Sequence, residues 1–232
     1  MLPKIVVLGS SNVDLIIKGE KIPKLGETVL GGTFYKAAGG KGANQAVAAA
    51  RAGGDVSFIS CVGNEYGEES IEGFRRDGIN VDHVKTDPDV ATGIALILVD
   101  INAENSISVA SGANLSLSVS DIQKARPIIS EADVLLMQLE IPIEVVEAAA
   151  QIAFSAGVTT ILNPAPARPL SDDLLKSIHI LTPNETETEL LTGMKVKNEI
   201  DAGNAASMIH KKGVDAVLVT LGSKGALLAD RE

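Results

Sequence analysis

Polar side chains follow the short apolar runs of this chain, one group after another. In an open parallel sheet the ligand crevice lies beyond the carboxyl ends of the strands, so these residues are the first candidates for chemistry. Five runs end in hydrogen-bonding residues: Ser10, Ser11, Asn12 and Asp14; Gln138 and Glu140; Asn163; Thr182, Asn184 and Glu187; and Thr220, Gly222, Ser223 and Gly225. The pattern predicts a polar site for a small molecule, the alternative being loop residues that are merely solvated.

Two carboxylates and two amides in this sequence suit a sugar. Asp14 and Glu140 follow different apolar runs, and each carboxylate can accept two hydroxyl hydrogens. Together with Asn12 and Asn44 they form the kind of set that binds several neighbouring hydroxyls. Either acid alone could equally be an ordinary exposed side chain, because the chain has 30 Asp and Glu residues.

A glycine-rich segment, Gly39-Gly40-Lys41-Gly42-Ala43-Asn44, runs directly into a helix-like stretch. Its glycines let the backbone approach a ligand closely, and free N–H groups at the helix start would offer donors to hydroxyl or phosphate oxygens. It is not a Walker A loop, because Lys41 is followed by Gly42 rather than Ser or Thr. The dinucleotide-binding pattern Gly-x-Gly-x-x-Gly does not follow the first run either. For the segment taken alone, a structural turn is the alternative.

Other chemistries have little support in the sequence. The single cysteine, Cys61, lies in an apolar run and is expected to be a buried, reduced thiol, which fits a reducing cytosol. His83, His179 and His210 lie far apart, without the spacing of metal ligands. No Gly-x-Ser-x-Gly motif marks a catalytic serine.

The apolar runs alternate with helix-like segments, which predicts an α/β protein. The expected strands cover residues 5–8, 56–62, 134–139, 158–162, 178–181 and 216–219. The expected helices cover residues 43–52, 68–77, 120–130, 143–156 and 202–211. Because the runs are apolar on both faces, we expect a three-layer sandwich, with a mostly parallel central sheet flanked by helices.

Two segments break this rhythm. Residues 15–35 carry glycines and a proline among β-forming residues, and residues 92–109 resemble two short strands around the turn Asn102-Ala103-Glu104-Asn105. We expect them to pair into one small β-sheet that stands off the main sheet, covering about residues 14–35 and 92–110. Such a sheet could be a lid, a dimer surface, or both.

Composition and charge narrow the possible partners. The 232 residues are 45% apolar and 22% charged, as is usual for a folded globular protein. The formal net charge of −10 repels phosphate backbones and anionic lipids, so we expect neither nucleic acid nor membrane as a partner. No apolar run approaches the roughly 18 to 20 residues of a membrane span, and none resembles a signal peptide. We therefore expect a cytoplasmic protein that binds small molecules.

Six separated motifs together resemble the ribokinase-like family of sugar and nucleoside kinases, in the family's order and over the whole chain. They are Ser10-Ser11-Asn12-Val13-Asp14; Gly39 to Asn44 followed by Gln45-Ala46-Val47-Ala48; Met137-Gln138-Leu139-Glu140; Asn163-Pro164-Ala165-Pro166-Ala167; Thr182-Pro183-Asn184-Glu185-Thr186-Glu187; and Thr220-Leu221-Gly222-Ser223-Lys224-Gly225. The second, third and fourth motifs are more similar to the ribokinases of this family than to its adenosine kinases or fructokinases.

The resemblance implies a carbohydrate kinase that converts D-ribose to D-ribose 5-phosphate with ATP. It assigns ribose binding to Asn12, Asp14, Gly40, Lys41, Gly42, Asn44 and Glu140. It assigns ATP binding to Asn184, Thr220, Leu221, Gly222, Ser223, Lys224 and Gly225. Glu187 would organise Mg²⁺ through water, and the small sheet would close over the sugar as a lid and form a homodimer surface.

The sequence departs from the family at its C-terminal end. The family places its catalytic base and anion hole in an Asp-Thr-x-Gly-Ala-Gly-Asp segment, which residues 1–232 do not contain, so the resemblance places the Asp base beyond Glu232. The residues that the resemblance assigns to adenine and to an activating K⁺ ion are also missing. We therefore expect one domain that is incomplete at its C-terminus, with no catalytic residue present and no turnover by itself. Asp14 is a poor substitute base, because the same carboxylate grips the sugar hydroxyls.

Two other functions remain open. One is a sugar-binding protein without catalysis, which ribose binding without ATP turnover would reveal. The other is a kinase for a different sugar or a nucleoside. A panel of pentoses and hexoses would separate these substrates, because wrong stereochemistry leaves buried carboxylates unpaired.

Overall fold

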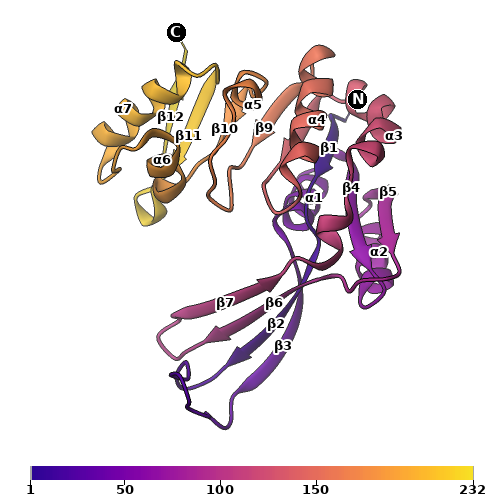
Figure 1. The fold of residues 1–232 in the computed structure, drawn as a ribbon, viewed down its shortest axis with the longest axis vertical. Helices are drawn as coiled ribbons and strands as arrows, with labels where there is room; N and C mark the ends of the chain where they lie inside the picture. The colour runs from indigo at the N-terminus through magenta and orange to yellow at the C-terminus, as the bar shows by residue number, and fades with distance from the viewer. Residues whose placement is uncertain (1, 232) are drawn as a thin grey trace.

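The computed structural model describes residues 2–231 and is built around one eight-stranded sheet. Its strands are β1 (Lys4–Leu8), β4 (Asp55–Gly63), β5 (Asn80–Asp87), β8 (Val134–Met137), β9 (Thr159–Leu162), β10 (Ile180–Leu181), β11 (Ala216–Thr220) and β12 (Ala226–Asp230). Across the sheet they lie in the order β12-β11-β10-β9-β8-β1-β4-β5 (Figure 1). Every neighbouring pair is parallel except the β11–β12 hairpin, so the predicted mostly parallel sheet is confirmed.

Helices cover both faces of this sheet, which confirms the predicted sandwich. One face carries α1 (Lys41–Arg51) and α2 (Gly67–Arg76), and the other carries α3 (Val119–Ser130), α4 (Ile143–Ser155), α5 (Asp172–Lys176), α6 (Glu185–Thr192) and α7 (Glu199–His210). Alternate residues of β1 serve the two sides: Leu8 packs in the larger core with α3 and α4, whereas Val7 packs with Phe74 of α2. The strands are apolar on both faces because each face of the sheet packs against its own hydrophobic core.

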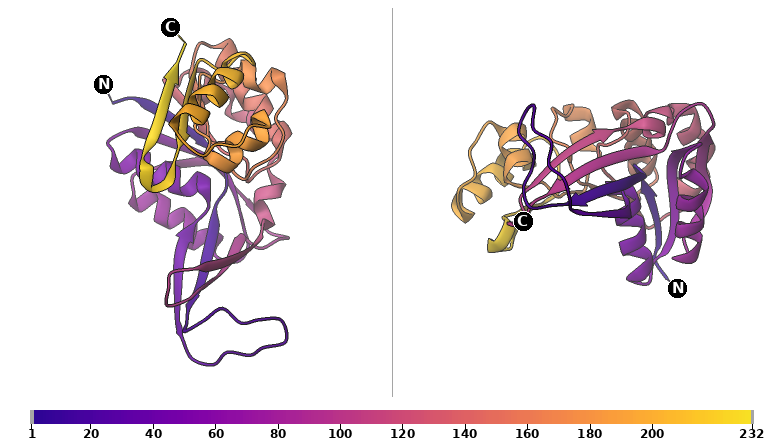
Figure 2. Two further views of the ribbon diagram at one scale, coloured as in Figure 1. Left: turned by 90° about the vertical axis from the view of Figure 1, so that its left-hand side faces the viewer. Right: turned by 90° about the horizontal axis from the view of Figure 1, so that it is seen from below.

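A second, four-stranded sheet projects from the sandwich (Figures 1 and 2). It consists of β2 (Asn12–Lys18), β3 (Thr33–Gly39), β6 (Gly93–Val99) and β7 (Asn105–Ala110), in the order β3-β2-β6-β7. We call it the small sheet. The two segments that interrupt the α/β rhythm do pair with each other, through parallel strands β2 and β6. The loop between β2 and β3 forms its far tip.

Most helices begin at a residue whose side chain caps them. Ser118 and Asn184 form capping boxes at the starts of α3 and α6, and Asn198 caps α7. Helix α1 differs, because its first flanking residue is Gly40, with a φ of 90° and no side chain to cap the helix. The first N–H groups of α1 must therefore find partners elsewhere in the structure.

Three elements lack a clear pattern in the sequence. Strand β5 lies at the edge of the sheet and alternates partly buried residues with exposed ones, so it has no continuous apolar run. Helices α5 and α6 have only 5 and 8 residues, too few to display a helical apolar stripe. The expected strand at residues 178–181 is shorter in the structure, where β10 is Ile180–Leu181.

Cys61 lies fully buried in β4, as expected. Burial raises the pKa of its thiol to about 11, so the thiolate that reacts with oxidants or metals is scarce at neutral pH.

Among residues 2–231, no helix is both long enough and apolar enough to cross a membrane.

The position of the larger core predicts which leucine contributes to the free energy of unfolding. Leu135 of β8 is fully buried, whereas Leu25, in the loop between β2 and β3, is fully exposed. Leu135→Ala should lower the free energy of unfolding by about 2–5 kcal/mol, because it leaves a cavity in the larger core. Leu25→Ala, the matched control, should change it by less than about 0.5 kcal/mol. Urea denaturation of the two variants measures both values, and equal losses would contradict this description of the core.

Candidate functional site

The ends of β1 and β8 lie side by side, and this brings the candidate sugar-binding residues together. Leu8 pairs with Met137 across the two strands. Ser10 and Glu140 follow these strand ends, so they meet although they are 130 residues apart in the chain. Asn12 begins β2 immediately afterwards, and Lys41 begins α1.

Glu140 is the centre of this cluster. Its Oε2 atom accepts hydrogen bonds from the Ser10 hydroxyl at 2.5 Å and from the Lys41 backbone N–H at 3.0 Å. The Lys41 ammonium lies 3.9 Å from Oε1, at the edge of ion-pair distance and partly exposed. The carboxylate therefore ties the end of β8 to the end of β1 and to the start of α1. Ser10 was not among the residues predicted to bind the sugar, although it stands in the motif Ser10-Ser11-Asn12-Val13-Asp14.

The N–H groups at the start of α1 are not free, contrary to the sequence-based expectation. The Lys41 N–H donates to Glu140, the Gly42 N–H to the Ser10 hydroxyl at 3.3 Å, and the Ala43 N–H to the Ser10 carbonyl at 2.8 Å. Gly42 is needed for this close approach, because a Cβ atom there would meet the backbone of Gly9 and Ser10 at about 2.5 Å. Neighbours distant in the chain thus replace the missing cap of α1.

Asn12 and Asp14 lie on one face of β2, because side chains alternate along a strand. Asn12 is 5% exposed, whereas Asp14 is half-buried. The Asp14 carboxyl group lies over Gly39 of the adjacent strand β3, where any side chain would overlap it. Burial, and then the nearby charge of Glu140, raise the pKa of Asp14 above its ordinary value. Two carboxylates this close together in a partly buried site are suited to receive hydroxyl hydrogens.

A cavity of about 470 Å³ adjoins Asn12 and Glu140. Its walls come from the base of the small sheet and from the segment after β8: Val109, Ser111, Leu115, Leu139, Ile141, Pro142, Ile143, Glu144, Pro166 and Arg168. This volume is within the range of small-molecule sites. Arg168 and Ser111 are polar residues of the cavity that none of the sequence motifs includes.

Asn44 is the least engaged of the predicted sugar-binding residues. Its backbone N–H continues helix α1 by donating to the Gly40 carbonyl at 2.9 Å, and its side chain is exposed. It lies one helical turn after Lys41, so it stands beside the cluster without a hydrogen bond to it among the contacts that residues 2–231 form.

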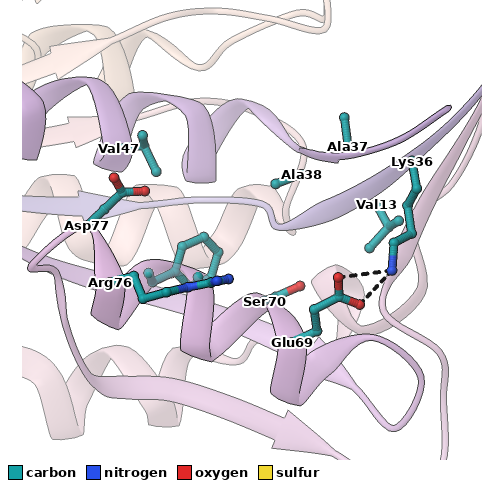
Figure 3. Close-up of a pocket in the computed structure, with 11 residues that line it drawn as sticks. Val13, Lys36, Ala37, Ala38, Val47, Glu69, Ser70, Arg76 and Asp77 are labelled. Atoms are coloured by element: carbon teal, nitrogen blue, oxygen red, sulfur yellow. Dashed lines mark hydrogen bonds and ion pairs between the residues drawn. The ribbon is translucent and has the colours of Figure 1, made fainter.

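A second cavity, of about 160 Å³, lies behind the small sheet and is a different site (Figure 3). It is lined by α1, α2 and β3, and Val13 points into it from β2. Because Val13 alternates with Asn12 and Asp14, it projects from the opposite face of the strand. The Lys36 ammonium pairs with Glu69 there at 2.7 Å, which links the small sheet to α2. None of the predicted sugar or nucleotide residues lines this cavity.

The predicted nucleotide-binding residues form a second cluster, at the ends of β10 and β11. Asn184 forms a parallel bridge with Thr220, and the Thr220 N–H donates to the Pro183 carbonyl at 2.9 Å. Leu221 is buried, whereas Gly222, Ser223, Lys224 and Gly225 form an exposed turn. The Lys224 ammonium donates to the Lys197 carbonyl at 3.3 Å.

Glu187 is held by Asn184 in the capping box of α6. Its Oε2 accepts the Asn184 backbone N–H at 2.9 Å, and its Oε1 lies 3.1 Å from the Asn184 side-chain amide. Among the residues that the structure describes, no group of three acidic, histidine or cysteine side chains could hold a metal ion. Glu187 would therefore contact a Mg²⁺ ion only if phosphates and water supplied most of its ligands.

None of the described residues 2–231 belongs to the Asp-Thr-x-Gly-Ala-Gly-Asp segment to which the resemblance assigns the catalytic base. Strand β12 ends at Asp230, and Glu232 itself lies outside the described residues 2–231. The expectation that the base follows Glu232, and that residues 1–232 hold no catalytic residue, therefore stays a prediction.

Both clusters lie at the C-terminal ends of strands in the main sheet. The strands β8, β9, β10 and β11 are parallel neighbours, so their C-terminal ends point the same way. Three steps of about 4.8 Å separate β8 from β11, or roughly 14 Å. At this separation, a sugar bound at the Glu140 cluster and a nucleotide bound at the Asn184 cluster could lie next to each other.

Comparison with known proteins identifies the relatives of this chain. The pfkB family of carbohydrate kinases matches residues 2–232. A ribokinase of Haemophilus influenzae is 49% identical over 230 residues, which cover 99% of this chain and 75% of the relative. A ribokinase of Staphylococcus aureus is 40% identical, covering 100% of this chain and 77% of the relative. The structure of an Arabidopsis thaliana ribokinase complexed with ribose and ATP is 36% identical, with a TM-score of 0.89, and the match covers 100% of this chain and 76% of that one.

The raised pKa of Asp14 predicts a gain in stability when its charge is removed. A carboxyl group whose pKa is raised by folding binds protons more tightly in the folded state, so its effect on stability improves as the pH falls through that pKa. Asp14→Asn should therefore raise the melting temperature of the unliganded protein at pH 7. The difference from the wild type should shrink below the pKa of Asp14. Calorimetry from pH 4 to 8 measures it, and a less stable Asn variant at pH 7 would refute the assignment.

Proposed function

Because this chain belongs to the pfkB family of carbohydrate kinases, we propose that it binds D-ribose and ATP for the transfer of the γ-phosphate to ribose, which yields D-ribose 5-phosphate and ADP. The observation that carries this proposal is the cluster around Glu140. The Asn12 amide and the Glu140 carboxylate line one cavity, and the Asp14 carboxyl group lies close enough to Glu140 for that charge to raise its pKa. Such a set recognises neighbouring hydroxyl groups, since hydroxyls donate to carboxylates and accept from amides.

Each half of the site has its own task in this proposal. Asp14 and Glu140 accept hydroxyl hydrogens of the sugar, while the Lys41 ammonium and the Asn12 amide donate to its oxygens. The Thr220–Gly225 turn and Asn184 hold the phosphates of ATP. Mg²⁺, when bound, would neutralise phosphate charge, with Glu187 orienting its water ligands. The small sheet, whose Val109 lines the cavity, acts as the lid that excludes water.

The transfer step also needs a group that accepts the proton of the reacting hydroxyl. We assign this role to none of residues 1–232, because Asp14 and Glu140 are both committed to holding the sugar. The resemblance assigns the base, the anion hole and the K⁺ site to none of residues 1–232. The proposed contribution of this chain is therefore to bind and orient both substrates.

Binding and turnover of the 232-residue chain should be measured separately. Ribose-dependent ADP formation in the presence of Mg²⁺ and K⁺ tests catalysis, and calorimetric titration with ribose tests binding. Ribose binding without turnover would support the orienting role or the alternative of a sugar-binding protein without catalysis, whereas turnover would show that residues 1–232 supply the base themselves. Tighter binding of a hexose or a nucleoside than of ribose would reject D-ribose as the substrate.

One substitution in each half of the site tests the two roles separately, and a substitution at a helix cap outside the site serves as the control. Asn184→Ala should lower ATP affinity about 10-fold and leave ribose affinity unchanged, while Asp14→Asn should lower ribose affinity about 10- to 100-fold and leave ATP affinity unchanged. Asn198 caps α7 and is not among the predicted sugar- or nucleotide-binding residues. Asn198→Ala is therefore the control, which should lose about 1 kcal/mol of stability, as expected for a lost cap, and keep both affinities. Calorimetric titrations of each variant measure the affinities. Equal loss of both ligands in one variant would contradict the division of the site.

The exposed side of the small sheet supports a second role for it, as a homodimer surface. Ile17, Phe34 and Leu96 are each at least 45% exposed, and they line a hollow of about 480 Å³ on the face of this sheet opposite to Asn12 and Asp14. Contiguous exposed apolar surface on a protein marks an interaction site. We therefore place two copies of the chain face to face through the small sheet. The buried, reduced thiol of Cys61 is compatible with the cytoplasm as their location.

The proposed dimer predicts that a charge placed in the hollow halves the mass of the particle in solution. The wild-type chain should sediment at twice its 24.0 kDa, and Leu96→Asp should sediment as the monomer, because a charge would be buried without a partner. Leu25→Asp, at an exposed residue outside the hollow, is the control and should leave the dimer intact. Analytical ultracentrifugation distinguishes the two states. A monomeric wild type at micromolar concentration would reject the dimer.

A further inference from the structure

Asn114 is buried next to the sugar cluster, and neither the motifs nor the roles above include it. It lies in the 3₁₀ helix Gly112–Ser116, which directly follows the small sheet, and only 1% of its surface is exposed. Its Oδ1 atom accepts the Ser11 N–H at 2.8 Å. Its Nδ2 atom lies 2.7 Å from Asn12 Oδ1, 2.9 Å from the Ser111 carbonyl and 3.2 Å from the Ser11 carbonyl.

Backbone groups determine which way the Asn114 amide points. A backbone N–H can only donate, so the atom that faces the Ser11 N–H must be the oxygen. The carbonyls of Ser11 and Ser111 can only accept, so the atom that faces them must be the nitrogen. The usual ambiguity between amide oxygen and nitrogen is thereby removed for Asn114.

The orientation of Asn114 then decides that of Asn12. Because Asn114 presents N–H donors, the Asn12 atom at 2.7 Å must be an acceptor, its Oδ1. The NH₂ group of Asn12 is left to face the cavity that Asn12 and Glu140 line. We propose that Asn114 is a positioning residue, which holds the Asn12 amide with its two N–H donors toward the sugar. This inference rests on the proposed binding of ribose at the Glu140 cluster.

The polarity of the site shows why this orientation matters. Asp14 and Glu140 provide only acceptors for hydroxyl hydrogens, so donors to the hydroxyl oxygens must come from the Lys41 ammonium and the Asn12 amide. A flipped Asn12 would add a third acceptor beside two carboxylates. Held by Asn114, Asn12 instead donates to a hydroxyl oxygen. One particular hydroxyl of ribose is therefore recognised by an amide that a second, buried amide orients.

Gly93 provides the space for this pair of amides. It stands opposite Asn12 in the pairing of β2 with β6. A Cβ atom at residue 93 would overlap both Asn12 Oδ1 and Asn114 Nδ2. Gly93→Ala therefore disturbs the same hydrogen bond from the opposite side, without removing either amide, and serves as a second, independent probe.

The test compares D-ribose with each of its monodeoxy analogues by calorimetric titration. In the wild type, the analogue that lacks the hydroxyl bound by Asn12 should bind about 10-fold more weakly than ribose. In Asn12→Ala, this analogue should bind as well as ribose does. Asn114→Ala should weaken ribose about 3- to 10-fold and abolish discrimination against the same analogue, with ATP affinity unchanged. The double variant should be no weaker than Asn12→Ala alone, because Asn114 acts through Asn12.

Thr160→Val is the control for a loss of buried hydrogen bonding without a role in the site. Thr160 is fully buried in β9, and its hydroxyl donates to the Ser177 carbonyl at 2.6 Å. This variant should be destabilised yet keep full discrimination among the analogues. If Asn114→Ala does not fold, Gly93→Ala must show the same loss of discrimination for the inference to stand.

Additive losses in the double variant, or discrimination that Asn114→Ala and Gly93→Ala leave intact, would overturn the inference while the proposed function survives. A wild-type chain that binds no pentose would overturn the proposed function and this inference with it.

Discussion

The hydrogen bonds to the Glu140 carboxylate are the interactions on which the site depends. They join three segments that the chain alone keeps far apart: the end of β8, the end of β1 and the first turn of α1. Their geometry requires that β1 and β8 be parallel neighbours, and that Gly42 pass close to Ser10. Once these conditions hold, the uncapped start of α1 is satisfied, and the sugar cluster is assembled before any ligand arrives. Such preorganisation lowers the entropic cost of binding.

The small sheet is joined to this cluster by shared residues rather than by a separate hinge. Strand β2 begins at Asn12, inside the cluster, and continues outward into the exposed apolar part of the sheet. Its alternation places Asn12 and Asp14 on the ligand side and Val13 on the side of the second cavity. If the small sheet closes as proposed, its movement carries Asn12 and Asp14 with it, so closure would be coupled to sugar binding.

The two halves of the site are stabilised in different ways. The proposed sugar half contains an unfavourable arrangement, because the Asp14 charge is partly buried near Glu140, and a bound hydroxyl would relieve it. Sites that bind ligands well commonly lower the stability of the free protein in this manner. The nucleotide half contains no such conflict within the described part of the chain, because Asn184 and Glu187 satisfy each other within a capping box and the adjacent turn is exposed.

The sequence by itself determined the sandwich, the small sheet and most of the residues at the candidate site. Strands buried on both faces must be apolar throughout, and the polar motifs that follow them in the chain lie at the end of the sheet where ligands bind. Both features can therefore be recognised in the sequence. It could not reveal the edge strand β5 or the short helices α5 and α6, whose burial is too partial or too brief to leave a pattern. Only the tertiary structure decided that the first N–H groups of α1 are occupied, that Ser10 reaches Glu140, and that Asn114 orients Asn12. These contacts join residues 99 to 130 positions apart, and they depend on the order of strands in space, which local sequence patterns do not encode.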